Sequence, residues 1–425
     1  MCQLFKISMF LTNLNIITGE KMKKIAYVLA SYPVLSETFV GTEMRNMQLC
    51  GHDIQPIAFH RHQGQYQKQD QALKDHTLFL SDYSKLCALK GLAYIDLGIL
   101  KAIKFSLLQQ GLPFKSLIAN ALKLVYLAKK NNCNHFHAHF GQGAAASAIV
   151  AARLCGATVS FVGHGYDIYA TPQDLKLKLN SVDFAIAVCQ EMVNYFNKIA
   201  PNAAVSLVYC GVEMDRFSNN HSTMVEQNAI AAKSIRNVQC KKNKLLFIGR
   251  LCETKGLFTL LHALKLLPKT QRPVIDLVGD GVLKSDLLQF VDDYQLTEHV
   301  NFLGEKQSTW FISNSHHYDA MIVPFELASN GDRDTGPVVV KEAMALKLPV
   351  ITTYFMGCKE FITHSTGLHV PTKNPPKLAE AIVQFYAMSP REVQSLKENA
   401  YHRVLELYSA KKQAANLSSI IEQHR

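Results

Sequence analysis

The sequence predicts an α/β protein built from two doubly wound domains that face each other across a cleft. At 425 residues, the chain exceeds the usual size of one hydrophobic core. Short apolar runs alternate with helical stretches from Met22 onward. The same alternation resumes after a polar, motif-free region, without a detectable sequence repeat. Two domains of one architecture account for all three observations.

Domain boundaries follow from changes in composition. We expect residues 1–21 to be a non-structural extension, because this apolar stretch has neither a cationic start nor a small-residue cleavage site. Met22 leads directly into a predicted strand, as expected if Met22 is a second translation start. Residues 22–218 form the first domain, the polar residues 219–243 a linker region, and residues 244–425 the second domain.

Apolar runs typical of a sheet buried on both faces predict the strands. In the first half these are residues 25–30, 54–59, 134–138, 158–162, 183–188 and 205–209, and in the second half 245–248, 274–278, 320–323 and 348–352.

Neither half carries a dinucleotide fingerprint. Lys284 stands where the last glycine of a G-x-G-x-x-G beginning at Gly279 would be required. A nicotinamide-dependent dehydrogenase is therefore disfavoured.

The net charge of +11 and the isoelectric point near 9.0 indicate an anionic partner. Nucleic acid, a phosphate-bearing substrate or an anionic bilayer would each satisfy this charge. No basic stripe is interleaved with aromatic residues, and Trp310 is the only tryptophan, so nucleic acid is the least supported. No run reaches the roughly 18 apolar residues of a membrane span. The ten cysteines form no C-x-x-C pair and are predicted to be reduced thiols in a cytosol.

The strand predicted at 245–248 leads into a glycine and two cations, Gly249, Arg250 and Lys255, just before an amphipathic helix. A helix start offers free N–H groups and a partial positive charge. Arg250 and Lys255 beside it would form a diphosphate pocket. The alternative is a solvated basic loop.

A second helix start follows the strand that ends near Pro324. Gly336 precedes Pro337, which we expect to be the first helical residue, and Asp334 and Glu342 flank this turn. Carboxylates there can accept hydrogen bonds from ribose or sugar hydroxyls. The alternatives are helix capping for Asp334 and a surface position for Glu342.

Histidines mark the carboxyl ends of two first-half strands. His164, between two glycines, favours a functional role over a structural one. His135, His137 and His139 share one strand face, which would permit a metal site. Packing near the cleft is preferred, because no acid or cysteine is nearby in sequence. Ser36 is expected to cap a helix whose turn lines an acceptor pocket.

Taken in order, these residues resemble family 4 glycosyltransferases, which are retaining enzymes of the GT-B fold with two Rossmann-like domains. Within that family the chain is similar to enzymes of bacterial exopolysaccharide and lipopolysaccharide assembly, of the colanic-acid type. The resemblance covers nearly everything from Met22 onward. It is carried by Y-P-x-x-S-E-T-F at 32–39, H-F-H-A-H-F at 135–140, H-G-Y-D-I-Y at 164–169, G-V-E-M-D-R-F at 211–217, G-R-L-C-E-T-K-G at 249–256, V-G-D-G at 278–281, and the acids Asp334 and Glu342.

The resemblance implies an acceptor domain followed by a nucleotide-sugar donor domain whose last helix packs back on the first. It implies catalytic roles for His164, near the reacting centre, and for Asp334, which contacts the transferred sugar and is normally Glu in the family. Donor-binding residues would be Gly249, Arg250, Lys255, Gly279, Gly336, Pro337 and Glu342, and acceptor-side residues Ser36, Glu37, Thr38, His139 and Asp167.

The family mechanism implies front-face attack with retention of anomeric configuration, without a cofactor or an obligatory metal. Arg250 and Lys255 would stabilise the leaving diphosphate. The segment between Leu100 and Lys130 contains lysines and no acidic residue, which would suit an anionic membrane surface. The lysines are Lys101, Lys104, Lys115, Lys123, Lys129 and Lys130. The alternative is a pair of core helices whose lysines reach into water.

The sequence therefore predicts a cytoplasmic glycosyltransferase, peripheral at the inner face of the plasma membrane. It would transfer sugar from a UDP- or GDP-linked donor to a lipid-linked or polysaccharide acceptor. The alternatives are a nucleotide-sugar epimerase or phosphorylase of the same architecture, which the stretches at 36–39 and 164–167 disfavour, and a non-catalytic nucleic-acid binder.

Overall fold

The computed structural model describes residues 22–217 and 243–424. The predicted extension, residues 1–21, lies outside the described residues, as does nearly all of the predicted linker region, residues 219–243. Among the described residues, no helix is both long and apolar enough to cross a membrane. The eight cysteines within these two ranges are all free thiols.

The first half is a seven-stranded parallel sheet in the order β3-β2-β1-β4-β5-β6-β7. Its strands are β1 Lys24–Tyr32, β2 Asp53–Arg61, β3 Leu78–Phe79, β4 His135–His139, β5 Thr158–Val162, β6 Phe184–Ala187 and β7 Val205–Leu207. Its helices are α2 Thr38–Leu49, α3 Gln71–His76, α4 Lys85–Gly91, α5 Ile99–Leu108, α6 Phe114–Lys130, α7 Gly143–Cys155, α8 Leu175–Leu179 and α9 Gln190–Ile199.

The second half is a six-stranded parallel sheet in the order β10-β9-β8-β11-β12-β13. Its strands are β8 Lys244–Ile248, β9 Val274–Val278, β10 Val300–Gly304, β11 Ala320–Val323, β12 Val350–Thr353 and β13 Leu368–Val370. The helices are α11 Leu257–Leu266, α12 Lys284–Asp293, α13 Ser308–Asn314, α14 Val338–Ala345, α15 Cys358–Phe361, α16 Pro375–Ala387, α17 Pro390–Leu407 and α18 Ala410–Gln423.

The predicted fold class is confirmed, because both halves are parallel α/β sheets. Three strands were not predicted, namely β3, β10 and β13. β3 has two residues and β13 has three, too few for a periodic signal. In β10 only Val300 is fully buried, so its sequence lacks a continuous apolar run.

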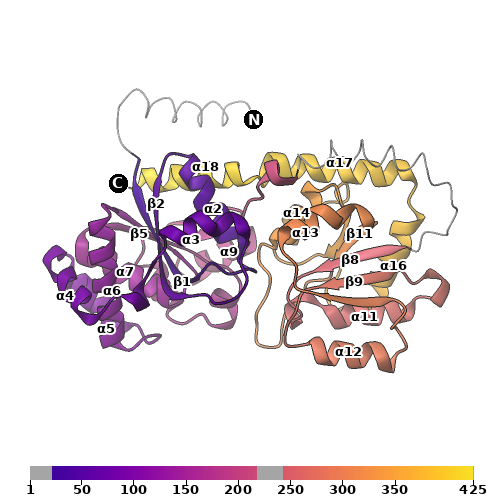
Figure 1. Cartoon of the computed structure of the whole chain (residues 1–425), viewed down its shortest axis with the longest axis horizontal. Helices are drawn as coiled ribbons and strands as arrows, with labels where there is room; N and C mark the ends of the chain where they lie inside the picture. The colour runs from indigo at the N-terminus through magenta and orange to yellow at the C-terminus, as the bar shows by residue number, and fades with distance from the viewer. Residues whose placement is uncertain (1–21, 218–242, 425) are drawn as a thin grey trace.

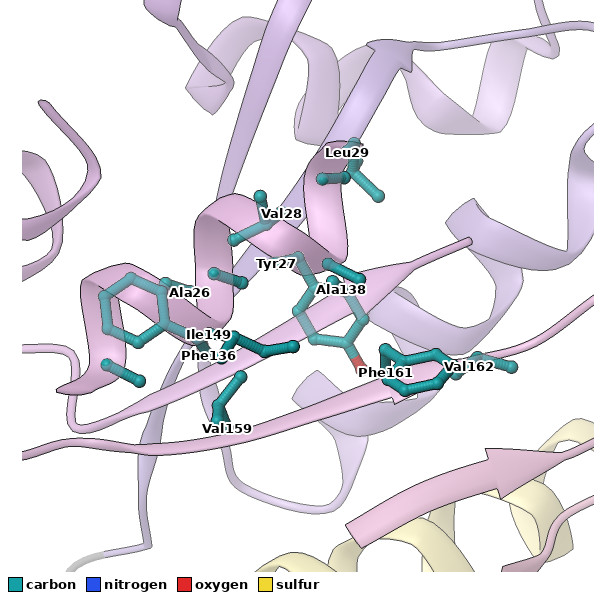
Figure 2. Packing of buried hydrophobic residues seen from close by; sticks show 14 of the residues in the cluster. Ala26, Tyr27, Val28, Leu29, Phe136, Ala138, Ile149, Val159, Phe161 and Val162 are labelled. Carbon is teal, nitrogen blue, oxygen red and sulfur yellow. The ribbon is translucent and has the colours of Figure 1, made fainter. Parts of the chain in front are cut away.

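The core of the first half lies around its central strands. Residues 26–29 of β1, Phe136 and Ala138 of β4, and Phe161 of β5 pack together with Ile149 of α7 (Figure 2). These side chains are almost completely buried. Helices on both faces exclude water from the sheet, which is why its strands are apolar on both sides.

Strand order reverses at one point in each sheet. In the first sheet the chain leaves β1 toward β2 and later returns to place β4 on the opposite side of β1. In the second sheet, β8 and β11 have the same relation. Ligands of open α/β sheets bind beyond the carboxyl ends of strands at such points. The loops after β1, β4, β8 and β11 are therefore the places to look for a site.

The chain crosses between the halves twice, and the two crossings lie side by side. The N–H of Val212 donates to Tyr408 O at 2.9 Å, and the N–H of Ala410 donates to Val212 O at 2.8 Å. A Cβ on Gly211 would lie 2.5 Å from Ala410 Cα, so only glycine fits there. Beyond this crossing, α18 packs against α2 of the first half, while α17 packs on α14 of the second (Figure 1).

Candidate active site

Two glycine-containing loops of the second half lie against each other beyond β8 and β9. The N–H of Gly249 donates to Val278 O at 3.0 Å, and that of Leu251 donates to Asp280 O at 2.9 Å. Gly279 has φ +141°, and a Cβ there would lie 1.9 Å from Gly249 O. Glycine is required at 279 for both reasons. The contact leaves the Arg250 side chain exposed at this edge of the sheet.

Lys255 and Asp334 form an ion pair just before α11. Lys255 ends a short 3₁₀ helix, Glu253–Lys255, and its Nζ lies 3.1 Å from Asp334 Oδ1. The lysine is largely buried, whereas the Asp334 side chain keeps 21% of its surface exposed. Asp334 Oδ2 is buried and has no hydrogen-bond partner among the described residues. That oxygen is free to accept a hydrogen bond from a ligand.

The turn after Asp334 opens α14. Pro337 was predicted to be the first helical residue, but α14 begins at Val338 and Pro337 occupies the preceding cap position with ψ 112°. Gly336 packs on Val188 of the first half. Asp334 does not cap the helix, because its Oδ1 pairs with Lys255.

Glu342 projects from the second turn of α14 and is partly exposed. Burial raises the pKa of its carboxyl to about 7, although the charges of Arg216 and Lys341 act in the opposite direction. Glu213 adds to the rise. Glu342 therefore titrates near neutral pH, which a fully solvated surface acid would not do.

In the first half, the Glu43 carboxylate of α2 gathers polar groups from three other elements. Its Oε1 accepts from Tyr27 OH of β1 and lies 3.1 Å from Nε2 of His139 in β4. Its Oε2 accepts from Gln413 Nε2 of α18 at 2.8 Å. His137 Nε2 is 3.2 Å from Oε1. All of these side chains are buried.

No acid lies near these histidines in the sequence, but folding brings Glu43 to His137 and His139 from 94 and 96 residues away. The ligand atoms of these three residues lie within 4.8 Å of one another, so they could hold a metal ion. The carboxylate oxygens already accept from Tyr27 and Gln413, however. We therefore describe the group as a hydrogen-bond network.

His164, which is itself buried, extends this network to the loop after β5. Its Nε2 lies 3.3 Å from His139 Nδ1, and the two rings stack. Burial holds the pKa of His164 well below its ordinary value, so the imidazole is neutral at pH 7. A neutral ring offers one donor and one acceptor nitrogen, and His139 orients one of them.

Asp167 holds the loops around His164. Its carboxylate accepts from the N–H of Gly141 at 2.7 Å and from the N–H of His164 at 3.0 Å. Burial raises its pKa to about 6, against the lowering effect of these two bonds. Asp167 is 1% exposed, so its carboxylate binds backbone N–H groups of the loops and is not available to solvent.

The loops of the two halves meet at these residues. A Cβ on Gly165, next to His164, would lie 2.0 Å from Arg333 O, next to Asp334. Burial raises the pKa of Glu37, while electrostatic interactions with His139 and Arg250 act to lower it. Glu37 of the first half is therefore within electrostatic reach of Arg250 of the second. The structure thus brings the loops of His164 and Asp334 together and places Glu37 near Arg250.

Two predicted first-half residues lie at the margin of this group. Ser36 was predicted to cap α2, but that prediction was wrong. The N–H of Glu37 donates to Val34 O and closes a turn before the helix. The N–H of Val40 donates to Glu37 O, so Glu37 is the cap residue and the helix begins at Thr38. Ser36 remains exposed and Thr38 is half-buried.

Sequence reasoning missed Glu43 and Glu360. Glu360 joins the halves, because its carboxylate accepts from Gln190 N–H at 2.9 Å and from Tyr209 OH at 2.6 Å. A signal for Glu43 existed in the sequence. It lies three residues after Val40 and four before Met47, within the apolar face of α2, where an unpaired acid would be unfavourable. Glu360 had no such signal.

Comparison with known proteins finds similarity to one family of enzymes. Residues 230–403 match the model of glycosyl transferases group 1. The match spans 174 of the 425 residues, all of them in the second half and the region before it. It is 22% identical over 422 residues to a Salmonella typhimurium glycosyltransferase assigned to colanic acid biosynthesis, covering 94% of this chain and 99% of that one. It is 25% identical over 386 residues to the amylovoran biosynthesis glycosyltransferase AmsK of Erwinia amylovora, with 85% and 90% covered.

Solved structures show the same GT-B fold. A Rickettsia africae glycosyltransferase aligns with TM-score 0.68 and 19% identity, covering 95% of this chain and 98% of that one. The Anabaena protein HepE, solved with UDP and glucose, aligns with TM-score 0.67 and 16% identity, covering 94% and 100%. The candidate site of this chain lies where its two α/β halves meet.

The Glu43 network predicts a large loss of stability on truncation. Glu43→Ala should lower the free energy of unfolding by about 3 kcal/mol at pH 7, because buried donors lose their charged acceptor. The histidines hold the pKa of Glu43 below its ordinary value against the effect of burial, so the stabilisation is present above pH 4.5 and is lost as the pH falls further. Urea unfolding at several pH values would measure both effects.

The matched control is Glu380→Ala, which removes an exposed helical glutamate. It should change stability by less than about 0.5 kcal/mol at any of these pH values. A Glu43→Ala protein as stable as the wild type at pH 7 would contradict the importance of the network.

Proposed function

We propose that this enzyme is a retaining glycosyltransferase of bacterial cell-surface polysaccharide biosynthesis. It transfers a sugar from a UDP- or GDP-linked donor to a lipid-linked or polysaccharide acceptor, in the cytoplasm at the inner face of the plasma membrane. One observation carries the proposal. Gly165, next to His164, approaches Arg333, next to Asp334, while Glu37 of the first half lies within electrostatic reach of Arg250 of the second. The colanic acid and amylovoran relatives support the pathway class.

Donor binding is assigned to the carboxyl edge of the second sheet. Arg250 is exposed there, and Lys255 stands beside the N-terminus of α11. Two cations and a helix start provide charge and N–H donors for a diphosphate. Gly249, Gly279 and Gly336 keep this edge free of side chains, and Pro337 holds the turn that opens α14.

Two acids would recognise hydroxyl groups of the donor. The free Oδ2 of Asp334 can accept a hydrogen bond from the transferred sugar. Ionised Glu342 can accept from both hydroxyls of the ribose. The Lys255 ion pair holds the Asp334 carboxylate in place.

In the transfer step, the bond between the anomeric carbon and the diphosphate oxygen breaks. An acceptor hydroxyl forms a bond to the same face of that carbon, and its proton passes to the departing diphosphate. Arg250 and Lys255 stabilise the negative charge that develops on the leaving group. Neutral His164, oriented by His139, contributes a hydrogen bond at the reacting centre, and Ser36, Glu37 and Thr38 lie on the acceptor side.

Thermal denaturation with UDP, GDP, CMP and their sugars tests the donor site. A single nucleotide and its sugars should raise the melting temperature, since a ligand that binds only the folded chain stabilises it. Arg250→Ala should weaken that binding at least about tenfold, because a charge-assisted contact is lost. Arg391→Ala, which removes another exposed arginine of the second half, is the control. No shift with any nucleotide in a folded sample would refute the donor assignment.

Nucleotide-sugar affinity should depend on pH through Glu342. Its pKa of about 7 in the free chain means that the carboxylate form becomes dominant as the pH rises from 6 to 8. Affinity should therefore increase about tenfold over that range. An intact nucleotide sugar is the appropriate probe, because its diphosphate does not titrate near neutrality. Titration calorimetry should show this rise for the wild type and a flat profile for Glu342→Gln; equal profiles would disprove the role.

Transfer should be unaffected by metal removal. Arg250 and Lys255 supply the positive charge that a divalent cation would otherwise provide at the diphosphate. An assay with excess EDTA, monitored by nucleotide release, should therefore run at the untreated rate. If activity were lost and then restored by Mg²⁺, leaving-group stabilisation would have to be reassigned from these two side chains to the metal.

A further inference from the structure

Apolar exposure in this chain is concentrated at one place. Of the 22 large apolar side chains that are exposed in the described residues, 11 lie between Leu86 and Phe114. They belong to α4, to a short 3₁₀ helix, Leu92–Tyr94, to the turn before α5, and to α5 with the start of α6. We call this surface the α4–α5 face. Its six most exposed members are Leu86, Leu89, Leu97, Leu100, Leu107 and Leu108.

Each of the two helices buries one face and presents a second face of large apolar side chains. In α5, Ala102 and Phe105 are buried, whereas Leu100, Ile103 and Leu107 follow one another at helical spacing on the opposite side. In α4, the buried side includes Ala88 and Gly91, and a Cβ on Gly91 would lie 2.2 Å from Leu122 O of α6. Core packing therefore does not account for these leucines.

The α4–α5 face is also cationic. Residues 85–115 contain five lysines, of which Lys101 and Lys104 lie on the outer side of α5. The only acid in this range is Asp96, whose Oδ1 accepts from the N–H of Leu97. Lys123 of α6 does not contribute, because its Nζ donates to Leu80 O.

The composition distinguishes between possible occupants. Protein interfaces are enriched in arginine and depleted of lysine, but residues 85–115 contain five lysines and no arginine. Two copies of this cationic face would repel each other. Lysines around exposed leucines instead match an anionic bilayer, where the apolar side chains enter the headgroup boundary and the ammonium groups meet lipid phosphates.

We propose that the α4–α5 face docks this glycosyltransferase on an anionic lipid bilayer. The inference rests on the proposed function in one respect only, which is that docking would give the enzyme access to a lipid-linked acceptor. α4 and α5 lie at the end of the first half farthest from the second half (Figure 1). Docking there anchors the acceptor-side half and leaves the donor-binding half away from the membrane.

Co-sedimentation of the full chain with vesicles tests the proposal. The chain should pellet with vesicles containing phosphatidylglycerol and much less with pure phosphatidylcholine. The double variant Leu100→Ser and Leu107→Ser should bind at least about tenfold more weakly. Lys101→Glu with Lys104→Glu should cause a similar loss that is smaller at high salt. These side chains are exposed, so folding should be unaffected.

Matched controls lie on the second half. Leu266→Ser with Val282→Ser removes two exposed apolar side chains, and Lys269→Glu with Lys306→Glu reverses two exposed lysines. Both control proteins should pellet like the wild type. The nucleotide-induced melting shift, measured on every variant, reports the donor site separately, so a failed donor assignment and a failed docking surface give different results.

Three outcomes would overturn the proposal. The first is wild-type binding that is equally strong to anionic and neutral vesicles. The second is no binding to anionic vesicles, and the third is an equal loss of vesicle binding in the control variants. A concentration-dependent dimer that Leu100→Ser abolishes, without vesicle binding, would reassign the face to self-association.

Discussion

The first half depends on the burial of one carboxylate. Glu43 lies within the apolar face of α2, and desolvation there would be costly unless every oxygen were paired. Tyr27, His139 and Gln413 provide the pairing from β1, β4 and α18. Because the last of these comes from the C-terminal helix, the network also ties the end of the chain to the centre of the first sheet.

The same network reaches the candidate reacting centre. His139 carries the arrangement from Glu43 to His164, whose backbone N–H is held by Asp167. A histidine at a loop between glycines would otherwise have several orientations available. Here its position follows from buried hydrogen bonds that begin in the core, so the structural and functional interpretations of these histidines are compatible.

Charge is balanced where the halves meet. Lys255 is paired with Asp334, and Arg250 acts on Glu37 of the opposite half. A diphosphate bound at this edge would share these cations with carboxylates that are already present. A donor bound here would therefore interact with the same few charges that lie between the two halves, in a region that is partly shielded from water.

Local patterns determined much of this protein. Apolar runs identified most of the central strands, because those strands are buried on both faces. The glycines, cations and acids after these strands identified the candidate site, because carboxyl ends of parallel strands share an edge. The short edge strands and the first residue of α2 could not be predicted from apolar runs, since both are set by hydrogen bonds to the backbone of neighbouring segments.

The sequence by itself determined the fold class, the order of the strands' apolar segments and the residue types available for donor chemistry. Only the tertiary structure decided their partners. It brought Glu43 to the histidines of β4, Asp334 to Lys255, and the leucines of α5 to the surface. The physical reason is that periodicity reports whether a position is buried or exposed. Which distant group balances a buried charge, or which face of a helix stays uncovered, depends on packing between segments far apart in the chain.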